Sequence, residues 1–169
     1  MAGIKDAIFS IMERLTSQVP SLAFVRIWNN QLADETDGKT YDFPKPAAFV
    51  EISIPNQHHP LGQAFSQIDA EVIIHLITED YDMTDGSYEQ FTQPYDLKAQ
   101  INAALTNYQP TQCSSLMRKS ESQDYNHSNL YHYIITYICA VIDTEGVPGE
   151  TLSIPPNDFT IDAQIDLNP

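Results

Sequence analysis

Two long stretches of the chain have the hydrophobic pattern of β-strands. In residues 66–79 (SQIDAEVIIHLITE) every second position from Ile68 to Leu76 is apolar, and most positions between them are polar or charged. A period of two is typical of a half-buried strand. Residues 130–143 (LYHYIITYICAVID) carry apolar or aromatic side chains on both faces. A strand of this kind must be covered on both faces, either by its own domain or by another chain.

The remaining patterns predict two helices and three further strands. Apolar side chains three and four positions apart predict one helix over residues 4–15. The same spacing predicts a second helix through residues 97–108, which tolerates Pro94 only in its first turn. Shorter runs predict the other strands, and the polar segment 31–46 is expected to be a long exposed loop or an extended hairpin tip. These three strands are expected at residues 23–28, 47–54 and 113–123.

The predicted fold class is therefore α+β. We expect a mostly antiparallel sheet with two helices packed against it, in the order α-β-β-β-α-β-β, followed by a C-terminal extended arm or strand. The apolar stripes of both helices should lie on the sheet and bury the centre of the long strands. The residues expected to be mostly buried are Ile8, Ile11, Leu15, Val72, Ile74, Leu97, Ile101, Leu105 and Ile138.

The last two strands should form a hairpin. Residues 124–129 (DYNHSN) are a cluster of turn formers, and a turn centred on Asn126 would place Cys113 opposite Cys139. The same register sets Met117 opposite Ile135 and Lys119 opposite Tyr133. The two cysteines would then lie within roughly 7 Å of each other, and we expect them to be reduced thiols.

The chain divides into two parts. Residues 1–143 are expected to form a single α+β domain, and residues 144–169 a proline-containing extended segment. Within that segment residues 159–167 alternate between apolar and polar side chains, as a strand does. Such a strand would pair either with its own sheet or, as an arm, with a neighbouring subunit.

The chain of 169 residues has a formal net charge of −15, and the charge is unevenly spread. Residues 1–65 hold five Lys or Arg and seven Asp or Glu, whereas residues 66–169 hold three and sixteen. This balance argues against a protein that binds nucleic-acid phosphates. It favours either simple solubility or a surface that must not bind DNA passing close by. Neither a secretory signal nor an apolar stretch long enough to span a membrane is visible, so synthesis in the cytoplasm is expected.

Motifs for catalysis or metal binding are not supported by their spacing. The acidic turn at residues 80–86 does not have the glycine and glutamate positions of a calcium loop. The adjacent His58 and His59 would point apart on a strand, and His127 and His132 have no matching carboxylate spacing. Nucleophile-elbow and phosphate-loop motifs do not occur. We therefore expect no catalytic, cofactor-binding or metal site, and no enzymatic activity.

Function is then expected to reside in surfaces. Tyrosines tolerate half-wet environments, and three of them share one face of the predicted strand 130–143. The alternating segment 159–167 offers a second surface. The candidate subunit interface consists of Tyr131, Tyr133, Tyr137, Phe159, Ile161, Ile165 and Leu167.

The order of elements, with AAFVEISI at residues 47–54, QIDAEVIIHLITE at 67–79 and DLKAQINAAL at 96–105, resembles a family of bacteriophage proteins. These are the small tail-terminator and tail-completion (head–tail neck) proteins of long-tailed phages. The resemblance covers about residues 4–143. It implies a virion protein whose subunits form a homo-oligomeric ring, often a hexamer, at the head-proximal end of the tail tube. The implied partners are other copies of the chain, the tail tube protein and the head-proximal neck protein, while DNA passes through without specific binding.

Two other classes of function remain open. An acidic DNA-mimic inhibitor would also be strongly negative, although it should array its carboxylates along exposed faces. A small α+β ligand-binding or enzymatic domain could have the same layout of elements. The mass of the protein in solution separates much of this, because the ring requires a multiple of subunits.

Overall fold

The computed structural model describes residues 3–32, 43–54, 59–60, 66–79, 88–126 and 130–143. Within these ranges the α+β class and the predicted order of elements are confirmed, with one additional two-residue strand, β3. The elements are α1 (Ile4–Gln18), β1 (Phe24–Ile27), β2 (Ala47–Ser53), β3 (His59–Pro60), β4 (Ser66–Glu79), α2 (Tyr88–Leu105), β5 (Met117–Asp124) and β6 (Leu130–Asp143).

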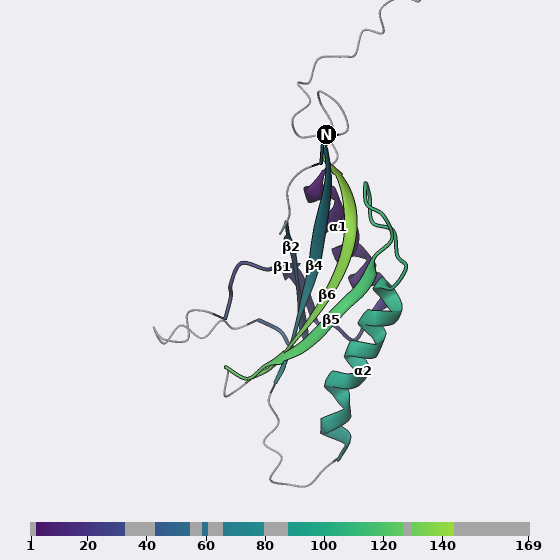
Figure 1. The fold of residues 1–169 in the computed structure, drawn as a ribbon. Helices are drawn as coiled ribbons and strands as arrows, with labels where there is room; N and C mark the ends of the chain where they lie inside the picture. Colours follow the sequence, from purple (N-terminus) through teal and green to yellow (C-terminus); the bar gives the residue numbers. More distant parts are fainter. Residues whose placement is uncertain are drawn as a thin grey trace, which may run out of the picture.

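One mixed sheet joins the strands in the order β1-β2-β4-β6-β5 (Figure 1). Its centre is the antiparallel pair β4–β6, which is in register from Ser66 opposite Asp143 to Glu79 opposite Leu130. β2 and β5 flank this pair in antiparallel orientation, β1 lies parallel to β2 at one edge, and β3 pairs with the start of β4. The long strands span the sheet from end to end, so residues far along them lie in different environments.

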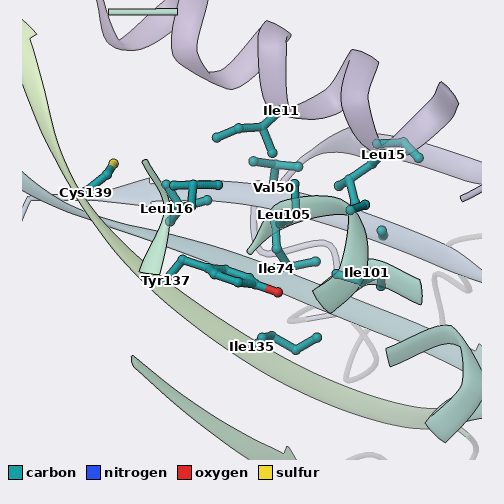
Figure 2. Packing of buried hydrophobic residues seen from close by; sticks show 14 of the residues in the cluster. Ile11, Leu15, Val50, Ile74, Ile101, Leu105, Leu116, Ile135, Tyr137 and Cys139 are labelled. Carbon is teal, nitrogen blue, oxygen red and sulfur yellow. The ribbon is translucent and has the colours of Figure 1, made fainter. Parts of the chain in front are cut away.

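Both helices pack on the same face of the sheet and build the main core (Figure 2). α1 buries Ala7, Ile11 and Leu15, which recur at the spacing of one helical face. α2 contributes Leu97 and Ile101 in the same way. The strand residues beneath them are Val50, Val72, Ile74, Ile135 and Tyr137.

Two of the predicted core residues are only partly buried. Ile8 lies at the side of the buried stripe of α1 and packs against the core without being enclosed by it. Ile138 lies on the other face of β6, because its neighbours Tyr137 and Cys139 point to the helices and successive side chains of a strand point to opposite faces. The prediction that Ile138 belongs to the main core was therefore wrong.

The second helix begins earlier than its proline suggested. α2 starts at Tyr88, so Pro94 lies inside the helix rather than in its first turn, and its side chain is buried. Proline removes one backbone hydrogen bond there. After it, the buried stripe of α2 includes Leu97, Ile101 and Leu105. The helix ends at Leu105, and Asn107 then takes a left-handed conformation with φ 62°.

The hairpin of β5 and β6 is confirmed, but its register differs from the prediction. Met117 faces Ile138 and Asp124 faces His132. Cys113 lies opposite Val141 instead of Cys139, and the strand is irregular between Arg118 and Ser120. A cluster of turn formers does not fix the centre of the turn, and here β5 continues through Asp124, which the sequence pattern assigned to the turn.

A smaller cluster covers one end of the opposite face of the sheet. Leu32 and Phe43 are buried against Phe49 and Ile77, with Trp28 packed beside them. The expectation that residues 31–46 form an exposed loop was therefore wrong at both of its described ends. Apolar residues at single positions of a polar segment give no periodic signal, so only the fold reveals their burial.

Candidate functional site

The structure separates the three tyrosines that were predicted to form one interface. Tyr137 is 0% exposed and lies in the core beneath α2 (Figure 2). Its hydroxyl donates a hydrogen bond to Oδ1 of Asn102, and burial raises its pKa. Tyr137 stabilises the interior of the subunit and cannot contact a neighbouring one, so this part of the prediction was wrong.

Tyr131 and Tyr133 lie near one end of the same strand face and are partly exposed. Their rings are parallel, with centroids 6.1 Å apart, and the ring of Tyr95 from α2 lies 6.4 Å from that of Tyr131. These three rings form an aromatic patch at the side of α2. Because they are partly exposed, Tyr131 and Tyr133 remain candidates for subunit contact.

An ion pair fixes this patch to the domain. Lys98 Nζ lies 2.8 Å from Oε2 of Glu121, and the Tyr133 hydroxyl donates to the same oxygen at 3.0 Å. Burial raises the pKa of Glu121, but hydrogen bonds from Lys98, Asn102 and Tyr133 outweigh it and hold that pKa below its usual value. The carboxylate therefore remains ionised and ties β5 to α2.

The other half of the predicted interface, Phe159, Ile161, Ile165 and Leu167, lies outside the described residues, as does the whole of the predicted segment 144–169. The acidic turn at residues 80–86 also lies outside them.

A buried histidine pair occupies the face opposite the helices. His75 on β4 and His132 on β6 are 6% and 3% exposed, and Nδ1 of His75 lies 3.0 Å from Nε2 of His132. The pair extends to a carboxylate at each end. Glu51 Oε2 lies 3.1 Å from His75 Nε2, and Asp124 Oδ2 lies 3.2 Å from His132 Nδ1. Four strands, β2, β4, β6 and β5, are thereby joined by one row of side chains. We call the four residues Glu51, His75, His132 and Asp124 the histidine row.

Trp28 covers this row. Its ring stacks on that of His75 at 3.9 Å between centroids and 8° between planes, and lies 5.9 Å from that of His132. Burial lowers the pKa of His75, and the hydrogen bond and charge of Glu51 oppose this shift only in part. A neutral His75 with its proton on Nε2 satisfies both contacts, since it donates to Glu51 and accepts from His132.

This row is suited to a structural role rather than to catalysis. Both imidazoles are shielded from solvent, and their facing nitrogens bond to each other. Among the residues that the structure describes, no group of three or more His, Cys, Asp or Glu side chains could hold a metal ion. In the sequence, His132 has no matching carboxylate spacing, and His75 is one of the polar positions between the apolar ones of residues 66–79. The contact becomes visible only once β4 and β6 are in register.

The two cysteines are buried, free and in contact through their side chains. The hydrogen bond with Cys139 and burial raise the pKa of Cys113. The same hydrogen bond lowers the pKa of Cys139, against the effect of burial. Both side chains are shielded from solvent, as is typical of structural cysteines.

The centre of the same sheet face is more open. Ile73, Ile134, Thr136 and Ile138 remain partly exposed, and we call these four residues the open face. At one end it is bounded by the histidine row, and at the other by the ion pair that Lys119 makes with Glu71. A hollow of about 460 Å³ lies at this second end, beside Ile138 and Ala140. The open face is thus an apolar strip between two charged borders.

The chain matches no protein-family model and shows no match to a curated protein. None of the helices in the described ranges is both long and apolar enough to cross a membrane.

Proposed function

We propose that this protein is a non-enzymatic structural subunit of a bacteriophage virion, which closes the tail tube or joins the tail to the head. In this role it works as a homo-oligomeric ring, in contact with the tail tube protein and a head-proximal neck protein. DNA passes through the ring without being bound specifically. The subunit is made in the cytoplasm of the host and ends in the virion.

The observation that carries this proposal is the uneven covering of β6. Its inner face, with Ile135 and Tyr137, is sealed by the two helices. Its outer face presents Ile134 and Ile138, which are only partly buried in the single chain. Apolar positions that a domain leaves partly uncovered at the centre of a sheet favour contact with another chain. The open face is therefore the first candidate for a subunit contact.

The charge of the chain supports the same role. A net charge of −15 repels the phosphates of DNA, which allows DNA to pass through a channel without being retained. Ring contacts join one patch of a subunit to a different patch of the next. The open face and the aromatic patch lie on opposite faces of the sheet and meet this requirement.

The decisive experiment measures mass by light scattering over a concentration series and images the particles by electron microscopy. We expect a closed oligomer with a central hole, whose population rises with concentration or on isolated tail tubes. Ile138→Asp should prevent assembly while the chain stays folded, because the side chain is partly exposed. Tyr125→Asp, at a position that is 81% exposed, is the matched control and should assemble normally.

A strict monomer at every concentration, which also fails to assemble on tail tubes, would overturn the proposal and favour an acidic mimic. A ring that assembles equally well with Ile138→Asp would keep the function but exclude the open face as the contact.

A further inference from the structure

An apolar hollow lies at the outer edge of β1. Its volume is about 630 Å³, and it is lined by Phe9 and Met12 of α1 together with Phe24 and Ile27 of β1. Phe9 and Ile27 are each 44% exposed, and both belong to the lining of this hollow. The hollow is thus an exposed apolar site beside a strand.

Among the strands that the structure describes, that strand is an edge of the sheet. β1 pairs with β2 on one side and is the last strand in the order. On its outer side, the carbonyl of Val25 accepts a hydrogen bond from the Arg26 guanidinium at 2.7 Å, and that of Ile27 accepts one from the Gln31 amide at 2.8 Å. Side chains from the same segment therefore occupy two carbonyls of this edge, and a further strand must displace both contacts in order to pair with β1.

Three cations lie over aromatic rings that line the hollow. Lys5 is 5.8 Å from the Phe9 ring, Arg26 is 4.6 Å from that of Phe24, and Lys45 is 5.4 Å from that of Phe43. None of these three makes an ion pair with a carboxylate among the described residues. The cations that do have carboxylate partners are Lys98, Arg118 and Lys119. In a chain of net charge −15, this is a local site for an acidic ligand.

We propose that the hollow and the β1 edge bind residues 159–167 of a second copy of this chain, which adds a strand to the sheet. The apolar side of the incoming strand contacts Phe9, Met12 and Ile27 on the helix side. Its acidic side lies toward Arg26 and Lys45 on the opposite side. This inference rests on the ring-forming function proposed above and identifies one of the contacts between neighbouring subunits.

The sequence of that segment matches the site in pattern and in charge. Phe159, Ile161, Ile165 and Leu167 alternate with polar residues, so that one side of a strand is apolar. Asp162 and Asp166 lie on the other side, and residues 151–169 contain no Lys or Arg. Strand addition to a sheet edge uses backbone hydrogen bonds for affinity and alternate side chains for specificity.

The length of the connecting chain permits the contact. β6 ends at Asp143, opposite the first residue of β4, whereas β1 lies beside the part of β2 that pairs with Ile74–Ile77. The two positions are therefore about 26–36 Å apart along the strands. Residues 144–158 can extend over about 50 Å, which is enough to leave one subunit and reach the next.

The test uses two full-length variants and their mixture, measured by analytical ultracentrifugation over a concentration series. Ile27→Asp places a charge in the hollow. Ile165→Asp places a charge on the apolar side of residues 159–167, which we call the arm. Each variant alone should require a roughly tenfold or higher concentration to associate. A 1:1 mixture should restore pairwise association, since the intact arm of the Ile27→Asp chain binds the intact hollow of the Ile165→Asp chain. The mixture should give heterodimers and not rings, because the next contact would join a disabled arm to a disabled hollow. Tyr125→Asp serves as the control and should behave as the wild type.

A labelled peptide of residues 157–169 provides a second readout. It should bind the Ile165→Asp chain, and Arg26→Gln in that chain should weaken binding about two- to fivefold and reduce its dependence on salt. A peptide of the same composition in scrambled order should not bind.

The outcomes separate the inference from the function on which it rests. Rings that form equally well from both variants would overturn the strand addition and leave the proposed function intact. Hydrogen exchange of the Val25 and Ile27 amides supplies a third result. If these amides are protected in a strict monomer, and the protection depends on Ile165, then residues 159–167 bind the sheet of their own chain. That result would overturn the proposal that they bind a second copy. A mixture that stays as dissociated as its components, together with no peptide binding, would also overturn the inference.

Discussion

The two faces of the sheet are built from the same strands but are filled in different ways. On the helix side, Val72 and Ile74 of β4 and Ile135 of β6 are fully buried in an aliphatic core. On the other side, the alternate positions of the same strands hold a histidine row and the open face. The helix side supplies the stability of the domain, while the other side has polar links at one end and partly exposed apolar residues at the centre. This difference shows that a face can be apolar without being part of the core.

The sharpest test of the comparison places one charge on either face of β4. Val72→Asp buries an unpaired carboxylate in the main core and should prevent soluble folding, as should Ile101→Asp on α2. Ile73→Asp, one residue away and on the open face, should give a folded chain that loses no more than about 1 kcal/mol of unfolding free energy. Circular dichroism and urea denaturation of the soluble fraction measure both effects. Equal damage from the two neighbouring substitutions would show that the faces do not differ.

The histidine row should have the next largest effect. His75→Ala leaves Glu51 and His132 without their shared partner, and should cost about 2–3 kcal/mol of unfolding free energy at pH 7.5. Because the folded pKa of His75 lies below 6.5, the unfolded chain takes up the proton first on acidification. The stability of the wild type should therefore fall as the pH drops below 6.5, with a slope that is smaller in His75→Ala. Urea denaturation at pH 7.5, 6.5 and 5.5 gives both quantities, and identical slopes would contradict the assigned shift.

A smaller effect is expected at the ion pair between β5 and α2. Glu121→Gln should lose about 1 kcal/mol at pH 7, since the side chain is only partly shielded from solvent. The folded pKa of Glu121 is below its ordinary value of 4.5, so its contribution is present above pH 4.5 and is lost as the pH falls through the folded pKa. The difference from the wild type should shrink between pH 7 and pH 3.5. Glu13→Gln, at an exposed position of α1, is the control and should leave the stability unchanged at both pH values.

The smallest change in stability is predicted on the open face itself. Ile134→Thr keeps a β-branched side chain on β6 and should alter the unfolding free energy by no more than about 0.5–1 kcal/mol. Thermal unfolding at low concentration, where the chain is a monomer, isolates this effect from any change in association. A loss comparable to that of His75→Ala would mean that the open face is covered within the single chain.

The fold could be predicted largely because its elements carry strong periodic signals. The bounds of β4 and β6 coincide with the two stretches first singled out, and α1 follows the spacing of Ile11 and Leu15. Which face of each strand the helices cover was harder to predict. Strand 130–143 is apolar on both sides, so its sequence alone does not indicate which side the helices cover, and Tyr137 was assigned to a surface for that reason.

Contacts between residues far apart in the chain could not be predicted from the sequence for a different reason. The row from Glu51 to Asp124 depends on the register of four strands, and a shift of even one residue exchanges the faces of a strand. The predicted hairpin register was wrong by three to four residues at Met117 and Asp124. Leu32 and Phe43 belong to a segment without periodicity, where burial is decided by the neighbours that the fold brings together.

Trp28 gives the histidine row a practical consequence, because it is the single tryptophan of the chain. Its indole stacks directly on the imidazole of His75, so all tryptophan fluorescence of the protein originates against this one side chain. An imidazolium quenches indole emission more strongly than a neutral imidazole does. Emission intensity followed from pH 8 downward therefore reports the protonation of His75 in the native state, without a label and without unfolding the protein. The chain carries its own optical probe at the boundary between its buried and its open face.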